Sequence, residues 1–285
     1  MDDPDHDELT RQVVDRFADT PDPRLKEVMA SLVRHLHAFA REVRLSEAEW
    51  REGIEFLTRV GRITSERRQE FILLSDTLGL SMLTVAMNSA RRAGATESTV
   101  LGPFHVGGAP RRGQGDDIAA GAAGTPCEVR GAVRGVDGEP IAGARIEVWQ
   151  ADAEGKYDVQ RPELAAHRAR AVLETDADGR YGFRTVVPAA YPIPDDGPVG
   201  AMLRATRRHP WRPAHLHFMI AAPGYSTLVT HVFRAGDPYL DSDAVFGVRQ
   251  SLIVEWKQRP DGSLLVEFDF ALDREDAVAG RPERR

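Results

Sequence analysis

Two different spacings of apolar residues divide the chain into a front part and a back part. Up to about residue 93, apolar side chains recur every three or four positions, as on one face of an α-helix. Ser46 and Glu49 have the spacing of a capping box, which predicts that a helix begins there. The run from Arg68 to Arg92 is apolar on most sides, so we expect it to be buried between layers or at a subunit interface. The clearest stripe consists of Val28, Leu32, Leu36, Phe39 and Val43.

After residue 100 the pattern changes to short runs of residues that favour β-strands, separated by Gly, Pro and Asp. Alternating or continuous apolar positions with turn residues between them are typical of a β-sandwich. We therefore predict a mixed fold, with a helical region at 1–97 followed by a β-sandwich domain at 98–285. The predicted strands are EVRGAVRG, ARIEVWQA, GRYGFRTVVP, HLHFMIAA, TLVTHVF, SLIVEW and LLVEFDF.

Composition narrows the class of protein. The chain has 285 residues, of which 42% are hydrophobic and 28% charged, as in a water-soluble globular protein. A net charge of −7 argues against nucleic acid as the main partner. No apolar stretch is long enough for a membrane span, and the acidic start MDDPDHDELT is no signal peptide, so we expect a cytoplasmic protein. With a single cysteine, Cys127, any metal must be bound by nitrogen and oxygen ligands.

The stretch RPAHLHFMI places His215 and His217 two positions apart in a predicted strand. Successive side chains in a strand alternate between faces, so both imidazoles lie on the same face. Such a pair is able to hold a metal ion, although buried histidines without a ligand are also common. A cupin would have a glutamate three or four residues later, but Ile220 and Ala221 stand there, and His231 is a candidate third imidazole.

Tyrosines are the further oxygen donors to consider. Tyr157 and Tyr191 each follow directly after a predicted strand, where sites are commonly built on sheets. A free phenol has a pKa near 10 and is a poor ligand for a divalent ion at neutral pH, whereas a trivalent hard ion such as Fe³⁺ can hold tyrosinate. Two histidines and two tyrosines would therefore suit ferric iron.

With these residues in place, the chain resembles the intradiol ring-cleavage dioxygenases of the catechol 1,2-dioxygenase type. The matching stretches are LGPFHV, GEPIAGARIEVWQADAEGKYD, YPIPDDGPVG and RPAHLHFMIAAPGY, in the family's order, and the helical front part matches too. The resemblance implies one Fe³⁺ per chain, with an aromatic diol or triol and O₂ as substrates. It also implies a homodimer built on the N-terminal helices, with a phospholipid as a possible occupant of an apolar tunnel at the dimer interface.

The resemblance also implies roles for individual residues. The iron ligands would be Tyr157, Tyr191, His215 and His217, and Tyr191 would leave the metal to take up a substrate proton. Arg212 would be a cation beside the substrate ring. His231 departs from the pattern of many catechol-cleaving relatives, in which we expect glutamine at this position; we place it beside the ligands and assign it no role. The residues expected to bind substrate are Leu73, Asp76, Val100, Gly102, Pro103, Phe104, Ile193, Pro194 and Arg212.

The ring substituent of the substrate is the finer question. EFILLSDTLGLSMLT and GDPYLDSDAVFGV look most like hydroxyquinol 1,2-dioxygenases, which implies cleavage of benzene-1,2,4-triol to 3-hydroxy-cis,cis-muconate, the enol form of maleylacetate. Asp76 is a carboxylate in an apolar run and needs a hydrogen-bond partner, so the third hydroxyl of the substrate is a candidate. A helix-capping or ion-pair role for Asp76 stays open, as do catechol and chlorocatechol as substrates. A non-enzymatic prealbumin-like binding module is the alternative of another class.

Overall fold

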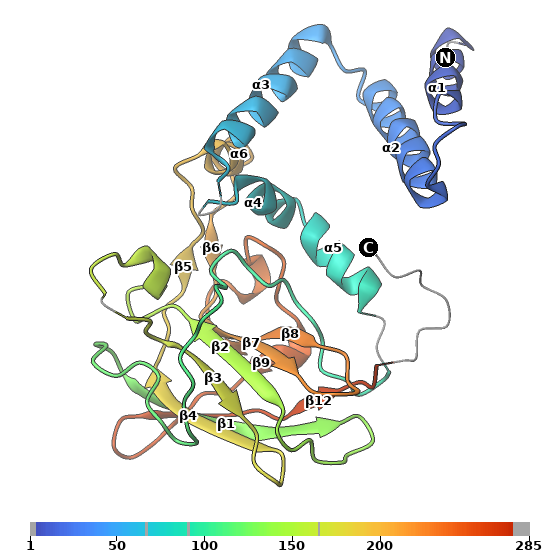
Figure 1. The fold of residues 1–285 in the computed structure, drawn as a ribbon. Coiled ribbons are helices and arrows are strands. Elements are labelled where there is room, and N and C mark those ends of the chain that lie inside the picture. The colour runs from blue at the N-terminus through green and yellow to red at the C-terminus, as the bar shows by residue number, and fades with distance from the viewer. Residues whose placement is uncertain (1–3, 66–67, 90–91, 165, 276–285) are drawn as a thin grey trace. The chain divides into compact units, whose positions relative to one another are not determined.

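The computed structural model describes residues 4–65, 68–89, 92–164 and 166–275 (Figure 1). Contacts divide the chain into two compact units, residues 1–59 and residues 60–285. Within the described residues, the first unit holds only helices and the second holds all the strands. Each unit is described by itself.

The first unit consists of α1 (Pro4–Asp15), α2 (Pro23–Glu42) and most of α3 (Glu47–Ile63). The predicted capping box at the start of α3 is confirmed, because the Ser46 backbone N–H donates to Glu49 Oε2 at 2.8 Å and the Glu49 N–H donates to Ser46 Oγ at 3.3 Å. These two bonds satisfy backbone donors that have no partner inside the helix.

The apolar stripe of α2 lies on the surface of this unit. Its five predicted members, from Val28 to Val43, are each 44 to 55% exposed. Trp50, Ile54 and Leu57 of α3 are exposed to a similar extent. The helical spacing is therefore confirmed, and it leaves a contiguous apolar face on α2 without cover from its own unit.

The predicted helical run from Arg68 to Arg92 contains two helices, α4 (Glu70–Thr77) and α5 (Leu80–Asn88). The break is at Gly79, whose φ of 75° lies in the left-handed region that glycine adopts without strain. The expected burial holds for one face only, since Leu73 and Met82 are buried while Leu80 and Met87 are 57% and 72% exposed. Among the described residues no single helix is long and apolar enough to cross a membrane; α4 and α5 reach that length only as a pair bent by 77°.

The second unit is a sandwich of two sheets (Figure 1). Every predicted strand run contains a strand, and the short strands β3, β5, β6 and β10 were not predicted. The first sheet has the order β10 (Lys257–Gln258), β11 (Leu264–Glu267), β1 (Pro126–Gly135), β12 (Phe270–Leu272), with β4 (Arg180–Val186) also paired to β1. The second has the order β3 (Arg170–Glu174), β2 (Arg145–Gln150), β7 (His215–Ala221), β8 (Leu228–Arg234), β9 (Ile253–Val254).

Further short elements of the second unit lie outside the two sheets. β5 (Tyr191–Pro192) and β6 (Trp211–Arg212) form a separate two-stranded ladder, and α6 (Pro198–Ala205) lies between them in sequence. The 3₁₀ turns are η1 (Asp158–Gln160), η2 (Leu240–Ser242) and η3 (Gln250–Leu252).

Alternation along β7 separates the core from the site. Leu216, Phe218 and Ile220 belong to the apolar core between the sheets. His215 and His217 therefore point to the outer face of the second sheet, as predicted for a pair two positions apart. Burial of both histidines, at 2% exposed, shows that this outer face is covered by other parts of the unit.

The two compact units meet between Arg59 and Val60, within α3, while the division into two domains at 97/98 stays a prediction. Helix α4 belongs to the same unit as the sandwich because it is bound to the segment around α6. Glu70, fully buried, accepts the backbone N–H of Val199 at 3.1 Å, and Arg68 bridges Glu70 and Asp196. The change from helices to strands still falls between Asn88 and Pro126.

Candidate metal centre

His217 lies in the middle of the second sheet, between two aromatic side chains on neighbouring strands. Its register partners are Trp149 on β2 and His231 on β8. The Trp149 ring is stacked on the imidazole, with centroids 4.7 Å apart, and the His231 ring is 4.2 Å away. Gly102 approaches from a loop so closely that a Cβ there would be 3.2 Å from His217 Cε1. The imidazole of His217 is therefore fixed in position by packing.

His215 has its protonation pattern set by the backbone. Its Nδ1 lies 2.7 Å from the carbonyl oxygen of Pro213, which can only accept a hydrogen bond. The proton is therefore on Nδ1, and Nε2 presents a lone pair. Nε2 of His215 is 3.0 Å from Nε2 of His217. Burial lowers the pKa of both imidazoles well below 6.5, so both are neutral and able to bind a cation.

Tyr157 reaches the histidines from the loop before η1. Its hydroxyl is 2.8 Å from His217 Nε2 and 3.2 Å from the Tyr191 hydroxyl. Phe104 is stacked on its ring at 4.3 Å, and Arg170 pairs with Asp158, the next residue in the chain. Tyr157 is completely buried, with its hydroxyl directed at the histidine pair.

Tyr191 is placed by the β5–β6 ladder, in which it is the register partner of Arg212. The loop before Tyr157 also packs on it: Gly155 has a φ of 79°, and a Cβ there would be 2.9 Å from Tyr191 Cβ. A side chain at position 155 would push the two tyrosine-bearing segments apart.

The four predicted ligand atoms lie in the order Tyr191 Oη, Tyr157 Oη, His217 Nε2 and His215 Nε2. The distances between successive atoms are 3.2, 2.8 and 3.0 Å. Four ligand atoms each about 2.1 Å from one ion stand roughly 3.0–3.4 Å apart, so this spacing fits a bound metal. Burial, and then the neighbouring Tyr191, raise the pKa of Tyr157 well above 10, so only a strongly charged cation would hold its phenolate. A ferric ion meets this requirement better than a divalent ion.

His231 is the third imidazole of the cluster. One ring nitrogen of each of His215, His217 and His231 lies within 4.8 Å of the others, which makes a three-histidine site the competing geometry. The Nδ1 atom of His231 is hydrogen-bonded to Thr99 Oγ1, and its Nε2 atom has no partner among the described residues. His231 thus lies beside the four predicted ligands, and among the described residues it has no hydrogen bond to any of them.

Arg212 contacts this group from β6. Alternation alone places Arg212 on the opposite face from the histidines, but the ladder ends at Arg212 and β7 begins only at His215, so Pro213 and Ala214 redirect the chain. Its Nη1 is 3.4 Å from both the Tyr191 hydroxyl and His215 Nε2. Burial opposes its charge, but Asp243 and the nearby tyrosines raise its pKa above the usual value, so it is a permanent cation.

The predicted substrate-binding residues fall into two groups. Phe104 contacts both tyrosine rings, and Gly102 contacts His217. Leu73, Val100 and Ile193 are buried, Pro194 is half-buried, and Pro103 is exposed.

Asp76 is 3% exposed on α4. Burial raises its pKa, while a hydrogen bond with Ser81 and the charge of Arg212 lower it, and the charge of Asp243 raises it. Asp76 therefore lies within electrostatic reach of the Arg212–Asp243 pair.

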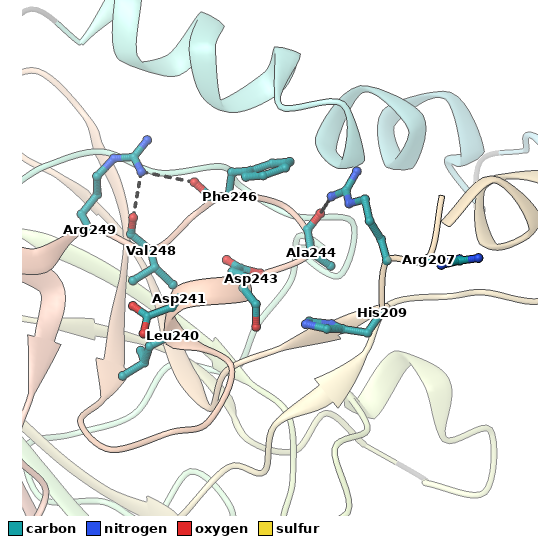
Figure 2. A pocket seen from close by; sticks show the side chains of 11 residues that line it. Arg207, His209, Leu240, Asp241, Asp243, Ala244, Phe246, Val248 and Arg249 are labelled. Carbon is teal, nitrogen blue, oxygen red and sulfur yellow. Dashed lines mark hydrogen bonds between the residues drawn. The ribbon is translucent and has the colours of Figure 1, made fainter. Parts of the chain in front are cut away.

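A surface pocket of about 470 Å³ is lined in part by Asp243, which is hydrogen-bonded to Arg212 (Figure 2). It contains none of the predicted substrate-binding residues. Arg208 donates to the carbonyl of Ala244 there, and Asp241 and Phe246 line the same pocket. The residues around the site that sequence reasoning missed are Trp149, Arg170 and Asp243.

Models of two known families match the chain. Residues 102–274 match the model described as "Dioxygenase", and residues 22–96 match the model described as "Catechol dioxygenase N terminus". The two matches meet between residues 96 and 102, near the predicted division of the chain.

Individual relatives extend over nearly the whole chain. It is 64% identical over 269 residues to 6-chlorohydroxyquinol 1,2-dioxygenase of Cupriavidus pinatubonensis, covering 94% of this chain and 98% of the relative. It is 57% identical to hydroxyquinol 1,2-dioxygenase of Nocardioides simplex, covering 90% and 87%. The crystal structure of hydroxyquinol 1,2-dioxygenase from Pseudomonas putida DLL-E4 is similar with a TM-score of 0.90 at 49% identity, over 95% of this chain and 99% of that one.

Proposed function

The chain belongs to the family of intradiol ring-cleavage dioxygenases, and on this premise we propose that it cleaves hydroxyquinol with O₂ to 3-hydroxy-cis,cis-muconate, the enol form of maleylacetate. The observation that carries the choice of hydroxyquinol is the buried carboxyl group of Asp76, within electrostatic reach of Arg212. Relatives named for hydroxyquinol or its 6-chloro derivative, at 57 and 64% identity, support it. Family membership sets aside the non-enzymatic binding module.

The cofactor in this proposal is one Fe³⁺ per chain, held by Tyr157, Tyr191, His215 and His217. Two neutral imidazoles with available lone pairs and two phenols in one buried group are a suitable donor set for a hard trivalent ion. When bound, the ferric ion supplies Lewis acidity to the two adjacent hydroxyl groups of the substrate.

Two side chains of the site handle charge in the reaction. Tyr191, as the phenolate that would bind the iron and be displaced from it, is the proposed acceptor of one proton released by the diol; its oxygen lies between Tyr157 and the guanidinium of Arg212. Arg212 stabilises negative charge on the substrate as oxygen is added, since its own charge is permanent and its Nη1 faces the site. The apolar cover of Phe104 and Leu73 limits access of water to the ring.

Asp76 is the residue that would make the enzyme specific for a substrate with a third hydroxyl group. A buried carboxyl group with few partners gains a hydrogen bond when a triol binds and stays poorly solvated when a diol binds. A site built to bond a hydroxyl rejects the analogue that lacks it by up to about 10⁴-fold. Catechol and chlorocatechol are therefore the less favoured substrates.

Oxygen uptake with hydroxyquinol, catechol and 4-chlorocatechol tests the proposal directly. The wild type is expected to have its highest kcat/KM with hydroxyquinol. In Asp76→Ala, kcat/KM for hydroxyquinol falls far more than that for catechol, whereas Glu174→Ala, a change at an exposed carboxylate paired with Arg111, leaves the ratio unchanged. An equal fall for both substrates, with iron retained, would contradict the specificity role of Asp76.

Assembly is part of the same proposal. The uncovered apolar face of α2 and the exposed residues of α5 suit burial in a homodimer built on the N-terminal helices. A phospholipid at that interface would occupy apolar space between the helices. Mass spectrometry of a solvent extract of the purified protein tests for the lipid, and an extract without phospholipid removes that part of the proposal.

A further inference from the structure

We propose that Asp243 is the residue that positions Arg212 for ring cleavage. The inference rests on the proposed function and adds a residue that the family resemblance did not supply. Asp243 follows η2, 31 positions after Arg212, and the two side chains are each 2% exposed. Arg212 Nε donates to Asp243 Oδ1 at 3.0 Å, and Nη2 donates to Oδ2 at 3.4 Å.

Asp243 is itself held rigidly by its own loop. The backbone N–H of Val245 donates to Oδ1 at 3.3 Å, and that of Gly247 donates to Oδ2 at 2.9 Å. The next residue, Ala244, donates its N–H to the carbonyl of Trp211 at 3.1 Å, which ties the loop to β6 beside Arg212. The carboxylate therefore has a fixed orientation before it meets the guanidinium.

Glycine at position 247 allows this close approach. A Cβ there would lie 3.1 Å from Arg212 Nη2 and 3.2 Å from Asp243 Oδ2. Any side chain would press on both partners of the ion pair at once. The loop is thus shaped around the pair, and the pair is more than a chance contact between two buried charges.

The consequence for the site lies in the remaining nitrogen of Arg212. A guanidinium is planar and its nitrogens are fixed relative to one another. With Nε and Nη2 bonded to Asp243, the position of Nη1 is fixed, and this atom lies 3.4 Å from both the Tyr191 hydroxyl and His215 Nε2. Asp243 touches neither of these residues among the described contacts, so it acts on the reaction through Arg212.

A pocket lined in part by Asp243 makes this arrangement testable by chemical rescue. Asp243 forms part of the wall of the 470 Å³ pocket, between Asp241 and Ala244 (Figure 2). A small carboxylate added to the solution is therefore able to approach the space that a shortened side chain leaves. Formate supplies the two oxygens that Arg212 has lost.

The experiment compares Asp243→Asn and Asp243→Ala with Asp241→Asn, a control on the exposed wall of the same pocket. We expect Asp243→Asn to keep its iron and to lose about 10²-fold in kcat, with KM changed less than about threefold, as for other lost charge-stabilising groups. Formate is expected to restore at least about tenfold of kcat in Asp243→Ala and to leave Asp241→Asn unchanged.

Crystal structures of the wild type and Asp243→Asn provide a readout that does not depend on activity, namely whether the guanidinium of Arg212 has turned away from Tyr191. An unmoved guanidinium, a kcat as high as that of Asp241→Asn, or no rescue by formate would each overturn the positioning role. Loss of iron in step with kcat would also overturn it, because the effect would then be general. If the wild type cleaves no diol or triol, the proposed function fails, while the orientation of Arg212 in the two structures still decides whether Asp243 holds it.

Discussion

Arg170 joins the two residues that enclose Tyr157. Its Nε donates to Asp158, the residue next to Tyr157, at 2.9 Å, and its Nη2 donates to the carbonyl of Phe104, which is stacked on the tyrosine ring, at 3.0 Å. Arg170 and Asp158 are only 2% and 4% exposed. The buried guanidinium of Arg170 thus holds both Asp158, which follows Tyr157 in the chain, and Phe104, which is stacked on the ring of this proposed iron ligand.

Replacing Arg170 with methionine is expected to lower the free energy of unfolding by about 3–5 kcal/mol, because it leaves Asp158 buried without its main cation. Iron content is expected to fall as well, because Asp158 and Phe104 would no longer hold Tyr157 in position. Urea unfolding and iron analysis measure the two effects. Arg111→Met breaks an exposed ion pair with Glu174, and its free energy of unfolding is expected to change by no more than about 0.5 kcal/mol. Equal effects in the two variants would contradict the role of Arg170 in holding Tyr157 in position.

Substitutions of the proposed ligands are expected to differ in their effects on iron content and on turnover. Tyr157→Phe or His215→Ala is expected to lower iron affinity by more than about tenfold, a loss that even residues around a metal site produce. The visible absorption of ferric tyrosinate falls in parallel. Tyr191→Phe keeps more iron and loses more turnover, since Tyr191 is the displaceable ligand.

Tyr181→Phe is the matched control, because this buried hydroxyl donates to the carbonyl of Phe268, outside the metal centre. It is expected to retain iron and colour. Full iron and full activity in Tyr157→Phe would exclude it as a ligand.

Asp76→Asn is expected to stabilise the protein at pH 8. Burial raises the pKa of Asp76 above 3.8, so the folded protein binds this proton more tightly than the unfolded chain. The stabilising contribution of the protonated group is complete below the unfolded pKa and is lost as pH rises through the folded pKa. The gain in urea midpoint over wild type is therefore larger at pH 8 than at pH 4.5; a gain independent of pH would show that ionisation of Asp76 has no part in it.

Cys127 is expected to be unreactive in the folded protein. Burial raises the pKa of its thiol to about 12, so at pH 8 only about one molecule in 10⁴ carries the reactive thiolate. Iodoacetamide labelling, followed by mass spectrometry, is expected to be complete in urea and negligible without it. Stoichiometric labelling of the native protein within minutes would contradict this.

Dimer formation has its own test on α2. A double change of Leu32 and Leu36 to aspartate places two charges in the exposed apolar stripe. Light scattering is expected to give a mass near twice 31.5 kDa for the wild type and near 31.5 kDa for the variant. Arg34→Asp, at an exposed position of the same helix, serves as the charge control. A wild type that is monomeric at micromolar concentration contradicts the proposed dimer.

Local patterns were sufficient to predict the longer strands, the start of α3 and the histidine face. Alternation in HLHFMI specifies which side of β7 is in the core, and the capping pair Ser46 and Glu49 specifies where α3 begins. The four proposed ligands were identified through motif resemblance, and their convergence depends on contacts between loops far apart in sequence. The cytoplasmic location and the division at 97/98 remain predictions.

Long-range partners could not be predicted in the same way. The segment GDPYLDSDAVFG contains three aspartates, and nothing in its pattern distinguishes Asp243, because its partner Arg212 is brought close only by the fold. Arg170 lies in RAVLE, too short a run to show alternation, so β3 and its buried ion pair were both missed. The bend at Gly79 was missed because apolar residues continue on both sides of it.

The connectivity of the first sheet has a consequence for the newly made chain. β1 pairs in parallel with β11 and β12, so Val129 lies opposite Val266 and Val133 opposite Phe270. During synthesis these partners of β1 are among the last described residues to emerge, and until then one edge of β1 has open backbone hydrogen-bonding groups. A chain released from a ribosome that stalls before residue 264 therefore contains both histidines but lacks the strands that complete the first sheet. Its unpaired edge of β1 and its incomplete core make such a chain a target for chaperones and prone to aggregation.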